Sequence, residues 1–340
     1  MEKKNIIIGS SISGLIAARI LNQNQIPFIG LERETSLFSS IETGQQRLLT
    51  ENAVKFIQQF APIVDWERID EAPCEIKKGE YSKLSAGSLE GHEKIYLKEH
   101  FFYPKVSFLE LVQKIADPVE ENFLTSKNVT EILASEKKVI CQDGSEYVYD
   151  NLYWCADLSS LLRICKQGKS TLKTSKKFED SKGVINLFWE TEPLITNKNS
   201  VTVSFRYKDY KLKAIGLADP LDHSQQQHLH WVLPIERELA EDREEIAKCV
   251  RTLKRELYKE FPEGPQKITK EKIVFNPTTT DDLHIPAKSL EVFEGVLYLG
   301  PNLSVKSEET EDASGQELSG LDLALVNCKS FQTSLNTAQN

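Results

Sequence analysis

The chain has 340 residues, of which 40% are hydrophobic and 27% charged, as in ordinary globular proteins. A net charge of −9 without a long basic run argues against nucleic acid as the main partner. Six scattered cysteines favour free thiols in a reducing, cytoplasmic compartment, and no apolar run approaches the ~20 residues of a transmembrane helix.

Residues 1–32 have the layout of a dinucleotide-binding βαβ unit. The apolar run 5–8 predicts a buried strand, and 15–21 predicts a helix packed on it. Between them Gly9 permits a sharp turn and Gly14 a close helix, whose N-terminus offers free N–H groups to a diphosphate. A second predicted strand ends at Glu32, whose carboxylate would accept the hydroxyls of an adenosine ribose. The predicted contacts are Gly9, Ser10, Ser11, Ile12, Ser13, Gly14, Glu32 and Arg33.

One position departs from the usual Gly-x-Gly-x-x-Gly pattern, because Ser11 replaces the middle glycine. Serine is the mildest replacement, and its hydroxyl could donate to a phosphate oxygen, although its Cβ takes up room. An α/β protein whose first turn only resembles a nucleotide site is the competing interpretation. The complete order of strand, turn, helix, second strand and acid favours nucleotide binding.

Further along, two amphipathic helices are expected, with Thr50 and Ser107 as N-caps. An Asp143-Gly144 turn between two β-type runs predicts a hairpin. The predicted helices are 50–60 and 108–116, and the predicted strands are 128–133, 138–141, 146–149 and 152–156.

The character of the chain changes after residue 166. Strand-like runs there suggest a mostly antiparallel lobe, covered by one long charged helix at 236–261. The predicted strands are Gly183–Trp189, Val201–Tyr207, Leu212–Leu217 and Leu229–Leu233. A buried strand at 295–300 and a helix from Gly315 to Val326 return to the first pattern, and the polar residues 333–340 are expected to form a flexible tail.

We therefore expect an α/β fold of two lobes. A Rossmann-like domain with a parallel central sheet would comprise residues 1–69, 105–165 and 285–332. A second α+β lobe with a mostly antiparallel sheet would comprise 70–104 and 166–284, and would bind a small-molecule substrate.

These motifs, taken in order, resemble the flavin-dependent amine oxidase superfamily, which includes protoporphyrinogen oxidases, phytoene desaturases and UDP-galactopyranose mutases. The resemblance rests on the N-terminal fingerprint, the 128–144 strand and hairpin, the Leu297-Tyr298-Leu299-Gly300 strand, and the helix containing Gly315, Ser319, Gly320 and Ala324. It implies an FAD-binding Rossmann-like domain. Besides the N-terminal contacts, it implies that FAD is bound by Arg47, Val129, Gly300, Gln316, Glu317 and Leu318.

Three departures from the family pattern bear on FAD affinity and catalysis. Ser11 is the first, Ser39-Ser40 stands near the place of paired glycines and an arginine, and Pro301 replaces an acidic ribitol ligand. Arg47 could serve the diphosphate instead, or could be solvated.

The resemblance implies an FAD-dependent oxidoreductase that transfers a hydride from a small molecule to flavin. One alternative is a flavin-dependent sugar-nucleotide mutase, suggested by residues 44–52. Another is a non-catalytic binding protein that kept the fold. No catalytic residue is identified, although Lys176, Lys177 and Lys182 lie in a plausible region.

His228 and His230 alternate along a predicted strand and would share one face. A metal pair is conceivable there, but no third ligand is evident, so an ordinary half-exposed strand is favoured and no metal is expected.

Overall fold

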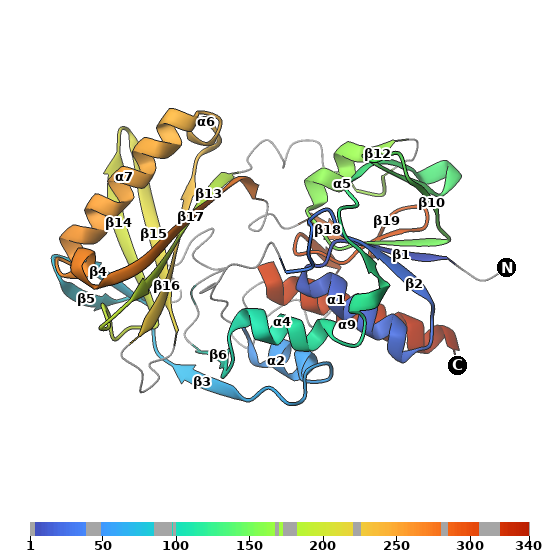
Figure 1. The fold of residues 1–340 in the computed structure, drawn as a ribbon, viewed down its shortest axis with the longest axis horizontal. Helices are drawn as coiled ribbons and strands as arrows, with labels where there is room; N and C mark the ends of the chain where they lie inside the picture. The colour runs from blue at the N-terminus through green and yellow to red at the C-terminus, as the bar shows by residue number, and fades with distance from the viewer. Residues whose placement is uncertain are drawn as a thin grey trace.

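Two groups of elements make up the computed structural model of the chain, one around a parallel sheet and one around a larger antiparallel sheet (Figure 1). The structure describes residues 4–38, 49–84, 97, 100–166, 170–172, 182–219, 226–279, 285–305 and 320–339. Each group has its own apolar core, and a third, smaller apolar cluster includes residues of the larger sheet.

The parallel sheet is organised around β1 (Asn5–Ile8), which is buried along its whole length. Three consecutive isoleucines suit this position because both faces of the strand are covered. The register places Ile8, Leu31 and Trp154 side by side, so three strands end at one edge. The order is β19 (Glu291–Phe293), β20 (Val296–Tyr298), β11 (Asn151–Trp154), β1, β2 (Phe28–Leu31) and β7 (Phe123–Leu124), with β19 antiparallel to β20.

Four helices gather on one side of this sheet, below it in Figure 1. They are α1 (Ile12–Gln23), α2 (Glu51–Ile57), α4 (Phe108–Ala116) and α9 (Gly320–Gln339). The small, fully buried side chains of Ala17 and Ala18 keep the packed face of α1 thin. Asp322 of α9 accepts hydrogen bonds from the N–H and the hydroxyl of Thr50, the N-cap of α2, at 3.1 and 2.9 Å. Helices α2 and α9, which lie far apart in the sequence, are thereby joined.

A second, four-stranded sheet packs on the same core through Val129, Ile132 and Val139. Its order is β10 (Glu146–Val148), β9 (Lys138–Cys141), β8 (Val129–Leu133) and β12 (Cys165–Lys166). The helix α5 (Leu158–Ile164) leads from β11 into β12. This sheet therefore brings the start of β8 close to the parallel sheet.

The larger sheet has seven strands and two different faces. On one face Trp189 and Trp231 pack with Leu253 and Leu257 of α7 (Arg243–Glu260). On the other, Val184 and its neighbours pack with β6 (His100–Pro104), which pairs with β3 (Trp66–Asp70). The order is β17 (Ile268–Thr279), β13 (Lys182–Thr191), β16 (Gln227–Ile235), β15 (Tyr210–Ala218), β14 (Ser200–Tyr207), β4 (Cys74–Lys77) and β5 (Glu80–Lys83).

The remaining described elements are short. β18 (Ile285–Ala287) pairs with β21 (Leu303–Val305) in parallel. The other short elements are η2 (Glu120–Asn122), η3 (Ala134–Glu136), α6 (Arg237–Ala240) and α8 (Gly264–Lys267).

The predicted mixed α/β fold class, with one parallel and one mostly antiparallel sheet, is confirmed. The division into two discontinuous lobes stays a proposal. It is supported by the pairing of β4, from the 70–104 segment, with β14 in the sheet otherwise built from 166–284.

The prediction of a single charged helix at 236–261 is wrong, because the structure has two helices there, α6 and α7. Asp242 interrupts the segment by accepting hydrogen bonds from the N–H groups of Glu244 and Glu245, at 2.7 and 3.3 Å, which makes it the N-cap of α7. The twelve-residue edge strand β17 was not predicted either. Its Lys-Glu-Lys run is typical of the charged residues that protect exposed sheet edges.

The flexible tail expected at 333–340 is also wrong over most of its length, because α9 continues to Gln339. Phe331 is buried and its ring contacts that of Tyr153 at 4.9 Å, while Leu335 packs against the core one turn later. Two exposed threonines also bond back to carbonyls one turn earlier, as in Thr333 Oγ1 to the Lys329 carbonyl at 3.0 Å. Tertiary packing of a few apolar residues thus holds a helix of weak propensity.

We predict that Phe331→Ala lowers the free energy of unfolding by about 3 kcal/mol, because it removes a buried aromatic ring. Thr333→Ala, on the exposed side of the same helix, should change it by less than about 0.5 kcal/mol. Urea unfolding followed by circular dichroism measures both. Equal, negligible effects of the two substitutions would show that this part of α9 is detached in solution.

Candidate functional site

The turn after β1 requires its two glycines for separate reasons. Gly9 has φ +94°, a conformation that residues with a side chain rarely adopt, and its N–H donates to the Leu31 carbonyl at 3.0 Å. A Cβ on Gly14 would lie 2.0 Å from the Gly9 carbonyl oxygen. The helix α1 can therefore begin directly behind the strand end only with glycine at both positions.

The first turn of α1 leaves backbone donors available. The first intrahelical hydrogen bond runs from the Leu15 N–H to the Ser11 carbonyl, at 3.0 Å. Within the described part of the chain, the N–H groups of Ile12, Ser13 and Gly14 donate to no acceptor. Free N–H groups and the helix dipole make this a favourable place for an anion.

Ser11, which replaces the middle glycine, uses its hydroxyl within the protein. Its Oγ donates to the Cys155 carbonyl at 2.6 Å and lies 3.1 Å from Ser13 Oγ. The expectation that this hydroxyl could donate to a phosphate does not match the structure, because its proton is already engaged. Any phosphate at this turn would be held by backbone N–H groups.

Glu32 is nearly buried at the end of β2, and both of its carboxylate oxygens accept backbone hydrogen bonds. Oε2 accepts from the Ser10 N–H at 2.7 Å, and Oε1 accepts from the Glu34 N–H at 2.9 Å. Ser10 Oγ in turn donates to the Leu37 carbonyl at 2.8 Å. Each carboxylate oxygen keeps a further lone pair, so Glu32 can order the turn and still accept hydroxyl donors.

A cavity of about 330 Å³ opens over the ends of these strands. Of the predicted site residues, Gly9, Ser10, Ser11, Glu32, Arg33 and Val129 line it. Its size is at the lower end of the usual range for ligand pockets, and it suits part of a dinucleotide rather than all of it. Six predicted contacts from three separate strand ends are thus brought to one place.

Sequence reasoning missed the wall of the cavity formed by Lys127 and by α5. Asp157, Ser160, Arg163 and Ile164 line it from this helix and its N-cap. The signal that could have revealed α5 is the Asp157-Leu-Ser-Ser-Leu-Leu run, an N-cap followed by helical spacing, directly after a buried strand.

The other predicted contacts lie elsewhere. Ile12, Ser13 and Gly14 are buried in the first turn of α1 and do not line the cavity. Gly300 does not line it either: a Cβ there would lie 2.3 Å from the Tyr298 hydroxyl, so packing explains this glycine. Arg47, Gln316, Glu317 and Leu318 lie outside the described residues, as do Ser39, Ser40, Lys176 and Lys177.

The cysteine next to the turn does not offer a nucleophile. Cys155 is buried under the Ser11–Ser13 segment, and burial raises the pKa of its thiol far above the ordinary value. Its thiol therefore stays protonated at neutral pH, and the arrangement of backbone donors and one carboxylate suits binding rather than bond cleavage.

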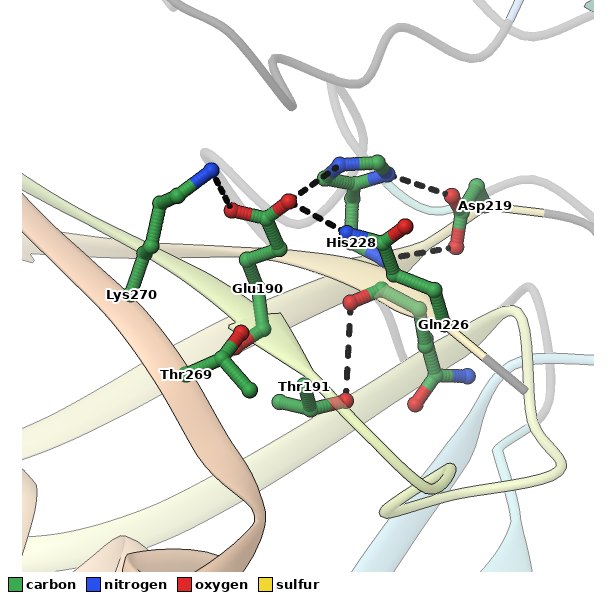
Figure 2. Close-up of polar contacts among 8 residues, drawn as sticks. Glu190, Thr191, Asp219, Gln226, His228, Thr269 and Lys270 are labelled. Atoms are coloured by element: carbon green, nitrogen blue, oxygen red, sulfur yellow. Dashed lines mark hydrogen bonds and ion pairs between the residues drawn. The ribbon is translucent and has the colours of Figure 1, made fainter. Parts of the chain in front are cut away.

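His228 and His230 have different partners on the face of the larger sheet opposite α7. His228 Nδ1 lies 3.0 Å from Asp219 Oδ2, and its Nε2 lies 3.9 Å from Glu190, which also pairs with Lys270 at 2.7 Å (Figure 2). His230 Nε2 lies 2.9 Å from Asn186 Oδ1. Among the described residues no group of three potential ligands could hold a metal ion.

The comparisons with known proteins identify the fold. No protein-family profile and no curated protein sequence matches the chain. A redesigned putrescine oxidase superposes with a TM-score of 0.64 at 8% identity, covering 99% of both chains. Reduced UDP-galactopyranose mutase gives 0.60 at 11%, covering 100% of this chain and 95% of the other.

A probable FAD-dependent monooxygenase from Pseudomonas aeruginosa gives 0.52 at 14% identity, covering 99% of this chain and 86% of the other. At such identities the likeness shows the fold alone. The chain thus has the fold of FAD-dependent flavoenzymes, including those of the amine oxidase type. No described helix is long and apolar enough to cross a membrane.

We predict that Gly14→Ala destabilises the protein by at least about 1 kcal/mol, because its methyl group would collide with the Gly9 carbonyl and displace the turn. Asn22→Ala, on the exposed side of the same helix, is the control and should be nearly neutral. Thermal unfolding of the two variants checks this; a fully stable Gly14→Ala protein would contradict the close approach.

We also predict a pH dependence from His228. The hydrogen bond to Asp219 raises its pKa above the ordinary 6.5, so the stabilisation is complete below pH 6.5 and is lost as pH rises through the folded-state pKa. An NMR titration of the His228 ring should show a pKa above 6.5 in the wild type and a lower one in Asp219→Asn. Asp209→Asn, in an exposed turn, should leave it unchanged; an equal pKa in all three would refute the assignment.

Proposed function

We propose that the chain is an FAD-binding oxidoreductase that oxidises a small molecule. The observation that carries the proposal is the position of the Glu32 carboxylate beside the Gly9–Ser11 turn, at the mouth of the 330 Å³ cavity. This is a donor and acceptor set suited to a ribose next to a diphosphate. The fold it shares with FAD-dependent enzymes supports the choice of flavin over other dinucleotides.

The described residues fit the nucleotide half of FAD. The N–H groups of the first turn of α1 would bind the diphosphate, and Glu32 the ribose. Val129, at the start of β8, lines the cavity and would place backbone groups beside the adenine. Ser11, in place of the middle glycine, would leave the diphosphate to backbone donors, because its own hydroxyl donates to the Cys155 carbonyl.

When bound, FAD would supply a flavin ring that accepts a hydride. The protein would contribute orientation and exclusion of water. The predicted contacts for the flavin end, Gln316, Glu317 and Leu318, remain a prediction from the sequence.

The first test is an absorption spectrum of the purified protein, followed by addition of FAD. Flavin bands, or a thermal shift with FAD but not with FMN alone, are expected. A colourless protein that neither binds FAD nor is stabilised by it would overturn the proposal. Bleaching by a candidate amine, with recovery in air, would identify the oxidase reaction.

A second candidate is a nucleotide-binding protein without turnover. It is favoured by one observation, the use of the Ser11 hydroxyl inside the protein at a position where the usual pattern has glycine. FAD binding without reduction by any tested amine, alcohol or sugar nucleotide would support it over both the oxidase and the mutase.

We predict that Glu32→Ala weakens binding of FAD and of ADP by about tenfold or more, because hydrogen bonds to a charged group contribute about 1.5–3 kcal/mol. Glu121→Gln, at an exposed position, serves as the control. Isothermal titration calorimetry measures both. Unchanged ADP affinity in Glu32→Ala would show that the carboxylate serves only to order the turn.

A further inference from the structure

The cavity is lined by three basic side chains, and two of them are paired with carboxylates. Arg33 Nε lies 2.9 Å from Glu34. Lys127 Nζ bonds Asp143, and the pKa of this carboxyl is held well below its usual range by the lysine and by Ser145. Arg163 is exposed and forms no ion pair with any residue that the structure describes. Among the described basic side chains that line the cavity, Arg163 is therefore the one without a carboxylate partner.

The polypeptide holds Arg163 at this wall through a series of local hydrogen bonds. The Trp154 indole N–H donates to the Asp157 carbonyl at 2.9 Å, and the Asp157 carboxylate accepts from the Ser160 N–H at 2.8 Å. The Ser11 hydroxyl donates to the carbonyl of Cys155, which lies between Trp154 and Asp157 in the sequence. The path from β11 into α5 is therefore tied to the same turn that would bind a diphosphate.

Both ends of α5 are anchored, which fixes the face it presents. Beyond its C-terminus, Cys165 pairs with Ile132 in β8, the strand that begins at Val129. Ser160, Arg163 and Ile164 are three and four residues apart and all line the cavity. Residues at this spacing share one helix face. This face combines a hydroxyl, a guanidinium and an apolar side chain.

We propose that Arg163 binds a phosphate of the nucleotide in this cavity. The proposal rests on the proposed function and adds a residue to it from outside the N-terminal fingerprint. Arginine suits the role because its planar guanidinium can donate two parallel hydrogen bonds to phosphate oxygens. A phosphate between the first turn of α1 and Arg163 would meet positive charge on both sides, with Ile164 beside the base.

The competing explanation is structural. Arg163 lies in the last turn of α5, where a cation interacts favourably with the helix dipole. That role predicts a loss of stability on substitution that is independent of ligand. Phosphate binding predicts instead a loss of affinity that depends on whether the ligand carries phosphate.

The test is isothermal titration calorimetry of the full-length protein with adenosine, ADP and FAD. The variants are Arg163→Gln, Arg163→Lys and, as a control on an exposed strand position of the larger sheet, Arg206→Gln. We expect Arg163→Gln to weaken ADP and FAD binding about tenfold while adenosine binding is unchanged. Arg163→Lys should recover part of the loss, the salt dependence of ADP binding should become shallower, and Arg206→Gln should match the wild type.

Four other results of these titrations would contradict the role of Arg163 in binding phosphate. Wild-type protein that binds neither ADP nor FAD overturns the proposed function and this inference together. Wild-type binding with unchanged affinity in Arg163→Gln overturns the inference alone. An equal loss for adenosine and ADP would assign Arg163 to the base instead of phosphate, and a lower melting temperature with unchanged affinity would assign it to the helix dipole.

Discussion

Two backbone N–H groups that donate to one buried carboxylate hold together the edge of the parallel sheet where β1 and β2 end. Through Ser10 and Glu34, Glu32 fixes the turn after β1 and the chain leaving β2 at the same edge of the sheet. The carboxylate is costly to bury unless it is fully hydrogen-bonded, and this pair of donors offsets that cost. The cavity forms where these two segments meet the start of β8 and the turn into α5.

The elements predicted best are those whose structure follows from signals within their own sequence. β1 and β2 are short apolar runs, and α4 has Ser107 as its N-cap and covers the predicted 108–116, because cap and spacing are both local signals. Gly9 and Gly14 were recognised because the turn admits little else. For the same reason Glu32 could be placed at the cavity from its sequence position alone.

What escaped prediction depends on contacts between distant segments. The end of α9 is polar, and the contacts of Phe331 with Tyr153 and of Leu335 with the core, between segments distant in sequence, explain why it is helical. Arg163 carries no motif, and its place at the cavity depends on the pairing of β12 with β8 as well as on the hydrogen bonds around Asp157. The sequence alone does not say what the Ser11 hydroxyl bonds to. In the structure it donates to the carbonyl of Cys155, the residue that follows β11. Contacts between segments so far apart in the sequence cannot be predicted from the pattern of neighbouring residues.

The link between Asp322 and Thr50 has a consequence for the order of events during synthesis. The turn after β1 is synthesised long before α9, the helix that packs behind it, and Cys328 of α9 donates to the Ser13 carbonyl at 3.5 Å. Between the two, the ribosome must produce the whole antiparallel sheet. Domains usually fold as units while the chain emerges. Here the β1–α1 segment cannot bury the surface that α9 covers until residues 320–339 have been synthesised, so part of its apolar packing is completed only late in translation.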